Sequence, residues 1–248
     1  MDREIRNWWS TVPYITKWLF ASMAIVTVAS GMNIFKPYYL ILDWPSTFKQ
    51  LQIWRPFTAT AHLGPLNFSF LIHLVFLYRY SCSLEIGSYA GRTADYLYAC
   101  IICAVLNIVS AFFMGYRITG SMLIMSIIYI WSRYNADTIV SFFFGIKFKG
   151  VYLPWAMMAI SFLSGGGHFP FDEFLGCISA HVYYYVNDVY PRVHGTTSYL
   201  KTPSFLKNVL PAEIQEQQRA REAEERRAQR PGTRAQGGYN WGTGHALG

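Results

Sequence analysis

The sequence predicts an all-α membrane protein, and three observations agree on this fold class. Of the 248 residues, 52% are hydrophobic and 18% are aromatic, whereas only 14% are charged. Apolar runs of helical length recur along most of the chain. The charged residues gather near the ends of the chain and in the short stretches between these runs. A soluble domain carries more charge over its surface, so this composition excludes an ordinary soluble enzyme or binding module.

Six apolar segments predict six transmembrane helices. They cover residues 14–29, 66–80, 96–114, 118–131, 151–163 and 174–190. A helix needs about 20 residues to cross a hydrocarbon core about 30 Å thick. Because the fourth and fifth segments have only about 14 and 13 residues, we expect those helices to be short and to thin the bilayer around them. The alternative is that flanking polar residues extend both helices.

The positions of the basic residues predict the orientation of the chain. An even number of spans places both termini on the same side of the membrane. If that side is the cytosol, it receives Arg3, Arg6, Arg79, Arg92, Arg133, Lys147, Lys149, Arg192 and Lys201. The opposite side receives only Lys36, Lys49, Arg55 and Arg117. Since bases near helix ends favour the cytosol, both termini are expected there, and the net charge of +7 reflects orientation rather than nucleic-acid binding.

The connection of residues 31–65 is too apolar for a solvated loop. Trp44, Phe48, Trp54 and Phe57 are side chains that prefer a membrane interface. Arg55 follows Trp54, and its guanidinium is expected to reach lipid phosphates while its aliphatic stem stays in the apolar layer. We therefore expect this connection to lie in the membrane surface on the side away from the termini.

The cysteines and histidines predict neither a metal site nor a cofactor. Cys100 and Cys103 have CxxC spacing, but they lie in the middle of an apolar segment without a second pair, so packing is their expected role. His62, His73 and His168 lack acidic or cysteine partners at the spacing of metal ligands.

The C-terminal part of the sequence changes character after the sixth segment. Residues 192–240 combine a short amphipathic stretch with a charged spacer, which we expect in the cytosol. Residues 241–248 hold an aromatic residue, two spaced glycines and a leucine, which suit an extended peptide that binds a partner. The alternative is a glycine-rich end without a role.

Several motifs resemble known families. Residues 54–58 look like the Trp-Arg element of the rhomboid superfamily, whose members share six-helix cores of this size. Residues 91–97, 135–142, 152–155 and 202–211 resemble Derlins, the rhomboid-like proteins of endoplasmic reticulum quality control. The resemblance implies a rhomboid-like bundle of six transmembrane helices (residues 1–191) with a flexible cytosolic C-terminal tail.

The resemblance implies a function in endoplasmic-reticulum-associated degradation, in which misfolded client proteins return to the cytosol across the membrane. The tail peptide is similar to the Derlin segment that binds the valosin-containing AAA ATPase, which implies ATPase contacts by Trp241, Gly242, Gly244 and Leu247. A membrane-embedded ubiquitin ligase complex and membrane lipid are further implied partners. Whether the chain forms a homo-oligomer stays open.

The sixth segment contains residues that suit helix packing. Gly176 and Ala180 are four residues apart, a spacing that lets a second helix approach closely. Derlins carry two glycines here, so Ala180 adds a methyl group to the closest contact. With His181, this pair is expected to shape the helix that lines the client path, although ordinary packing explains the spacing equally well.

The sequence argues against catalysis. Active rhomboids use a GxSG serine on the fourth helix and a histidine on the sixth, but Thr119 and Met122 stand where Ser121 would need glycines. His181 follows a small residue as the rhomboid histidine does, so an active intramembrane serine protease is the alternative. A small transporter is a further alternative, but it would need broken helices or charged pairs at mid-membrane.

Overall fold

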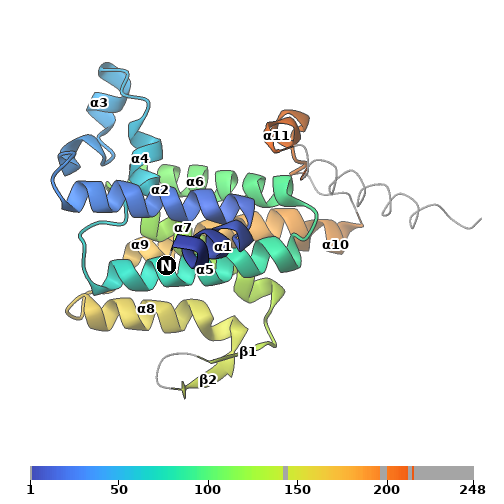
Figure 1. Cartoon of the computed structure of the whole chain (residues 1–248). Coiled ribbons are helices and arrows are strands. Elements are labelled where there is room, and N and C mark those ends of the chain that lie inside the picture. The colour runs from blue at the N-terminus through green and yellow to red at the C-terminus, as the bar shows by residue number, and fades with distance from the viewer. Residues whose placement is uncertain (1, 142–144, 196–199, 212–213, 215–248) are drawn as a thin grey trace, which may run out of the picture.

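The computed structural model describes residues 2–141, 145–195, 200–211 and 214, and it shows a mainly helical protein (Figure 1). The fold class is confirmed at that level. The six predicted segments fall in order on α2 (Tyr14–Gly31), α5 (Phe68–Ser83), α6 (Thr93–Met114), α7 (Gly120–Tyr134), α8 (Leu153–Ser164) and α9 (Phe171–Tyr184). By length and composition, α2 and α6 are able to cross a membrane, and the apolar stretch Gly150–Ser164 is shorter. The number of spans stays a prediction.

Helix α7 is the centre of the bundle. Its buried residues come from all around its circumference and include Met122, Ile124, Ile127 and Trp131, which is the pattern of a helix enclosed by protein. Helices α5, α6, α8 and α9 pack against it. Its 15 residues and the 12 residues of α8 agree with the expectation that these helices are short.

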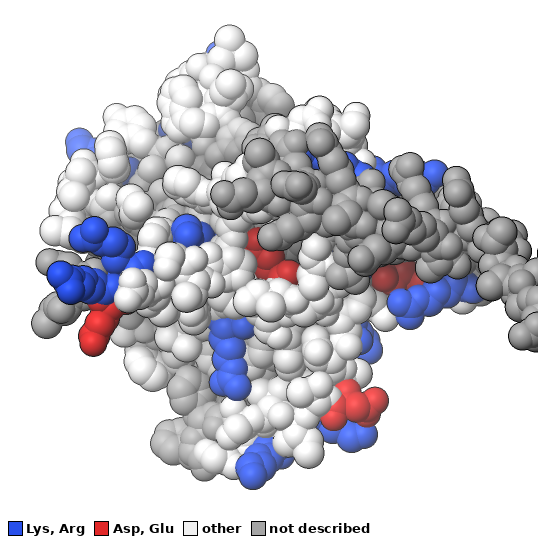
Figure 2. All heavy atoms as spheres, turned by 45° about the vertical axis from the view of Figure 1, so that its right-hand side comes forward, with Lys and Arg blue, Asp and Glu red and all other residues white. Residues whose placement is uncertain are grey.

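The helices bring widely separated segments to the same end of the bundle. The end of α5, the start of α6, α10 (Tyr190–His194) and α11 (Ser204–Val209) lie at one end, whereas α3 (Trp44–Lys49) and α4 (Arg55–Ala61) lie at the other (Figure 1). Figure 2 turns the α10 end toward the viewer, and Lys and Arg side chains are spread over this face.

The start of α2 is capped from another helix. α1 (Asp2–Thr11) precedes it, and Pro13 at the N-cap supplies no side-chain hydrogen bond. Glu85, in the π-helical turn Leu84–Ser88 after α5, accepts hydrogen bonds from the backbone N–H groups of Ile15 and Thr16, both at 2.9 Å. A carboxylate at this position satisfies exposed donors at the positive end of the helix.

A small hairpin between α7 and α8 is absent from the sequence prediction. β1 (Ile139–Ser141) pairs antiparallel with β2 (Lys147–Lys149), and Val140 lies opposite Phe148. Lys149 Nζ lies 3.0 Å from Asp137 Oδ1, and this hydrogen bond raises the pKa of Lys149. A 3₁₀ turn (Gly150–Tyr152) then leads into α8. Strands of three residues are too short to show a period in the sequence.

Candidate membrane-loop and helix-packing sites

Arg55 lies at the centre of the α2–α5 connection (residues 32–67), which contains a 3₁₀ turn (Pro37–Tyr39), α3 and α4. The Arg55 side chain is only 1% exposed. Its Nε donates a hydrogen bond to Gln52 Oε1 at 2.5 Å, and its Nη1 donates to the carbonyl oxygens of Tyr38 at 2.8 Å and Ile41 at 3.0 Å. The guanidinium also lies 5.1 Å from the centre of the Tyr38 ring.

These contacts correct one expectation. The prediction that Arg55 reaches lipid phosphates is wrong, because its donors are directed at carbonyl and amide oxygens of its own connection. A guanidinium has five N–H donors in a fixed plane, so it can hold several carbonyl oxygens at once. Arg55 therefore fastens the turn at Tyr38 to the start of α4.

Further hydrogen bonds make the α2–α5 connection a folded unit. Asp43 caps α3 by accepting hydrogen bonds from the backbone N–H of Ser46 at 3.2 Å and from the Ser46 hydroxyl, and the hydroxyl bond lowers the pKa of Asp43. The backbone N–H of Leu42 donates to the Arg117 carbonyl oxygen at 2.8 Å. This last bond ties the connection to the segment between α6 and α7.

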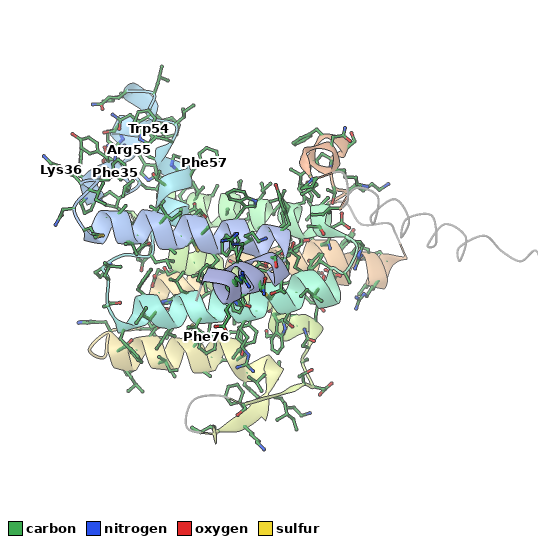
Figure 3. All side chains as sticks on the ribbon, in the orientation of Figure 1. Phe35, Lys36, Trp54, Arg55, Phe57 and Phe76 are labelled. Atoms are coloured by element: carbon green, nitrogen blue, oxygen red, sulfur yellow. The ribbon has the colours of Figure 1, made fainter. Side chains whose placement is uncertain are left out.

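The outer surface of the α2–α5 connection is apolar. Trp54 is 50% exposed and Phe57 is 77% exposed, although Arg55 between them is buried. Figure 3 shows Phe35, Trp54 and Phe57 around Arg55 at the end of the bundle that carries α3 and α4. Burying a cation while exposing large aromatic side chains is the reverse of a water-soluble loop and suits a surface that faces lipid.

Helices α7 and α9 are in close contact at Gly176. A Cβ atom added to Gly176 would lie 2.3 Å from the Met122 carbonyl oxygen, so only glycine fits at this distance. The Ser126 hydroxyl donates a hydrogen bond to the Gly176 carbonyl oxygen at 2.8 Å. Ala180, one turn further along α9, is fully buried. Gly176 and Ala180 thus face protein, and α7 is the helix that approaches Gly176.

His181 lies on a different face of α9 from Ala180. Its Nδ1 is 2.6 Å from the Tyr129 hydroxyl, which accepts a hydrogen bond from Arg133 Nε at 2.9 Å. A hydroxyl has one proton and two acceptor lone pairs, so the Tyr129 hydroxyl binds Arg133 and His181 at the same time. These side chains line a cavity of about 260 Å³ between α7, α8 and α9, together with Trp155 and other apolar residues. The structure therefore separates His181 from the Gly176–Ala180 packing face.

Ser121 and His181 make separate contacts. The Ser121 hydroxyl donates to Asp172 Oδ2 at 2.7 Å, near the starts of α7 and α9, whereas His181 meets Tyr129 further along both helices. Eight residues of helix separate Ser121 from Tyr129, a rise of about 12 Å. A serine nucleophile needs its base within hydrogen-bond reach, so this arrangement does not favour the protease alternative.

The sequence prediction missed a buried polar cluster that joins three helices. His73 Nε2 of α5 lies 3.1 Å from Glu173 Oε1 of α9, and the Ser161 hydroxyl of α8 donates to the same oxygen at 2.5 Å. Glu173 is 3% exposed, and its Oε2 has no hydrogen-bond partner. The sixth segment was predicted to begin at Phe174, which left Glu173 in a loop. A histidine inside an apolar segment was the available signal, because such a residue needs a polar partner.

Other polar side chains of the predicted apolar segments have partners inside the bundle. Asn107 is fully buried and donates a hydrogen bond to Ser126 at 3.2 Å, and His73 is buried beside Glu173. Each of these side chains therefore has a polar partner inside the bundle. Among the described residues, no group of three or more His, Cys, Asp or Glu side chains is placed to hold a metal ion.

The predicted ATPase-binding residues lie outside the described part of the chain. They are Trp241, Gly242, Gly244 and Leu247. Their role stays a prediction. The strap (residues 200–211), which precedes them, is described: it contains α11, and the Thr202 hydroxyl donates a hydrogen bond to Asp95 Oδ1 of α6 at 2.6 Å.

The fold and these contacts define a mainly helical scaffold in which the serine and the histidine of the alternative active site do not meet. The model of the Der1-like family matches residues 12–204. The chain is 37% identical to the "Probable derlin-1 homolog" of Dictyostelium discoideum over 98% of this chain and 99% of that protein. It is 38% identical to "Derlin-1" of Mus musculus and 37% identical to "Derlin-1" of Homo sapiens, each over 84% of both chains. The chain belongs to the Der1-like family.

Proposed function

We propose that this protein is a non-catalytic component of endoplasmic-reticulum-associated degradation that aids the retrotranslocation of misfolded proteins across the endoplasmic reticulum membrane. The observation that carries the proposal is similarity to proteins named Derlin-1 over 84% of the chain. The match to the Der1-like family covers residues 12–204 and so includes Arg55 and Gly176. The separate contacts of Ser121 and His181 support a role without peptide-bond hydrolysis.

In this proposal the six helices span the membrane and both termini lie in the cytosol. The distribution of charge supports this orientation. Arg79 lies in the last turns of α5, Arg92 directly before α6 and Arg133 in the last turn of α7. The end of α5 and the start of α6 lie at the end of the bundle that also carries α10 and α11 (Figure 1). Bases at the α10 end agree with the rule that positive residues near helix ends stay in the cytosol.

The mechanism proposed here depends on α8 and the α2–α5 connection. Helix α7 is short but enclosed by protein, so its length places no demand on lipid. Helix α8 is exposed at Trp155 and Leu163, and its 12 residues span about 18 Å against a hydrocarbon core of about 30 Å. With the outward aromatic residues of the connection, this mismatch would thin the bilayer locally. A thinner bilayer lowers the cost of moving polar polypeptide across it.

The work of extraction is assigned to a partner. Trp241, Gly242, Gly244 and Leu247 are proposed to bind the valosin-containing AAA ATPase at the cytosolic face, and a membrane-embedded ubiquitin ligase complex is proposed to act beside it. Gly176, Ala180 and His181 are proposed to set the helix that borders the path of the misfolded client. The close approach at Gly176 and the cavity beside His181 support this assignment.

Affinity capture from detergent-solubilised membranes tests the proposal. The intact chain should co-purify with the ATPase, and a chain that ends at Asn240 should not. Trp241→Ala should lose the ATPase as well, whereas Tyr239→Ala, an aromatic change just before the peptide, should retain it. Equal recovery with the intact and the shortened chain would refute the tail assignment. Normal turnover of a misfolded reporter in cells that lack the protein would refute the degradation role.

A further inference from the structure

A cavity of about 610 Å³ opens at the α10 end of the bundle, between the bundle and the strap. It is separate from the α2–α5 connection and from the cavity beside His181. Side chains from three parts of the chain line it: Tyr89 and Arg92 before α6, Asp188 and Arg192 after α9, and Lys201 and Lys207 of the strap. The strap therefore forms one wall of the cavity.

The lining of this cavity is basic. Its charged residues are Arg92, Asp95, Asp188, Arg192, Lys201 and Lys207, so four bases face two acids. Asp95 already accepts a hydrogen bond from Thr202 at 2.6 Å, and Asp188 accepts one from Tyr134 at 2.9 Å. Arg192 also forms an ion pair with Asp188, with 3.7 Å between Nη2 and Oδ1. The four bases still outnumber the two carboxylates, so the net charge of the lining is positive and the cavity attracts negative charge.

Among the bases of the cavity, Arg92 is the one whose position is fixed most clearly by the contacts of its own side chain. Its Nη2 donates to the Ser88 carbonyl oxygen at 3.0 Å, which holds the guanidinium beside the cavity. Its Nε is buried and has no hydrogen-bond partner. A buried N–H group of a charged side chain without an acceptor is costly. The rest of the guanidinium lies 5.9 Å from the centre of the Tyr89 ring, so its positive charge is only partly compensated by its own chain.

Two further features of the cavity favour a bound anion, namely neutral hydroxyl donors and the start of a helix. The Tyr89 hydroxyl lies 3.5 Å from the Tyr134 hydroxyl, and burial raises the pKa of Tyr89, so its hydroxyl keeps the proton that it donates. Arg92 is the N-cap of the 22-residue helix α6. The start of a long helix contributes partial positive charge in the same place.

We infer that this cavity binds a phosphate-bearing anion, with Arg92 of the bundle and Lys201 of the strap as its main contacts. A phosphate group has several oxygens that accept hydrogen bonds from guanidinium and ammonium groups. It can therefore bind donors that approach from different elements of the fold. A bound anion would join the strap to the bundle and so fix the start of the C-terminal tail. The headgroup of an anionic phospholipid and a soluble phosphate share this chemistry.

The test uses the full chain in nanodiscs and two probes. One set of nanodiscs contains phosphatidylcholine alone and receives inorganic phosphate, and the other contains phosphatidylcholine with a small fraction of phosphatidylinositol phosphate. Nanodiscs with a fatty acid, an anionic lipid without phosphate, at the same total charge control for non-specific attraction. The hydrogen-exchange rates of the strap backbone report how firmly the strap is held against the bundle. Native mass spectrometry reports bound lipid. Slower exchange with inorganic phosphate identifies a soluble source, and slower exchange only with the phosphoinositide identifies a headgroup.

Three variants separate the site from general charge. Arg92→Gln and Lys201→Gln should each weaken binding at least about tenfold, which corresponds to about 1.4 kcal/mol, because each removes a charged hydrogen-bond donor. Lys201 is exposed, so its variant should fold normally even if Arg92→Gln does not. Arg79→Gln removes an exposed base of α5 that does not line the cavity and should bind as the wild type does. If neither probe protects the strap, or if Lys201→Gln binds both probes as the wild type does, the inference is overturned.

Discussion

Arg55 donates a hydrogen bond from Nη1 to the carbonyl oxygen of Tyr38 at 2.8 Å, across 17 residues of chain. The same nitrogen donates to the Ile41 carbonyl oxygen. One side chain thereby sets the distance between the 3₁₀ turn and α4. Since Trp54 and Phe57 flank Arg55 and are exposed, the buried cation also determines which surface of the connection carries these aromatic residues.

Replacing Arg55 with alanine should loosen the α2–α5 connection without unfolding the bundle. Two backbone carbonyl oxygens would lose their donor, so local opening should become easier by about 2–4 kcal/mol. Hydrogen exchange in nanodiscs should show faster exchange in residues 32–61 and unchanged exchange in α7. In cells, degradation of a misfolded reporter should stall while ATPase capture persists.

Lys36→Ala is the matched control for Arg55→Ala. Lys36 is an exposed base in the same connection (Figure 3), so its removal should change neither the exchange rates nor reporter degradation. If Arg55→Ala gives the same exchange rates as the wild type, Arg55 does not organise the connection.

Gly176→Ala should separate α7 from α9. The added Cβ would meet the Met122 carbonyl oxygen at 2.3 Å, and backbone on both sides leaves no flexible group to move. Overpacking of this kind costs about 1–3 kcal/mol, so thermal unfolding in detergent should shift to lower temperature. Gly87→Ala is the control, because a Cβ there would meet nothing within 4 Å. Equal melting temperatures for both variants would contradict the close packing.

The sequence alone predicts the helices and part of their packing. Long apolar runs identify α2 and α6 because the physical requirement is a sustained lack of polar side chains. Gly176 was identified because close helix approach needs a small residue, and the structure brings that glycine against α7. Both are local properties, readable without knowing which segments become neighbours.

The contacts between distant segments were beyond the sequence. The acceptors of Arg55 are backbone carbonyl oxygens, which every residue carries, so no residue type indicates them. His73 and Glu173 are 100 residues apart, and a segment boundary placed one residue too late hid the partner. The neighbours Ala180 and His181 were assigned to one site, although successive helical residues point about 100° apart.

Glu173 and His73 should be energetically coupled. Each is buried: removing Glu173 leaves His73 Nε2 without its partner, and removing His73 leaves the Glu173 carboxylate with Ser161 alone, so both Glu173→Ala and His73→Ala should destabilise the fold. The double variant should cost less than the sum of the two by about 1 kcal/mol or more. The free energies of unfolding of the wild type, the two single variants and the double variant, measured in detergent micelles, give this coupling energy. A cycle of His73→Ala with Asp137→Ala, an exposed residue of the hairpin connection, should be additive. Additive costs for His73 and Glu173 would contradict their interaction.

Purified protein in vesicles should not cleave a transmembrane peptide. Serine hydrolysis needs a base that takes the hydroxyl proton and donors that stabilise the oxyanion, all in register. The Ser121 proton is instead directed at Asp172, and His181 Nδ1 is occupied by the Tyr129 hydroxyl. Ser121→Ala and His181→Ala should therefore leave the peptide as intact as the wild type does. Both substitutions remove a reactive group but leave the Gly176 contact that holds α7 against α9. A cleavage product that forms with the wild type and disappears in either variant would therefore establish the protease alternative.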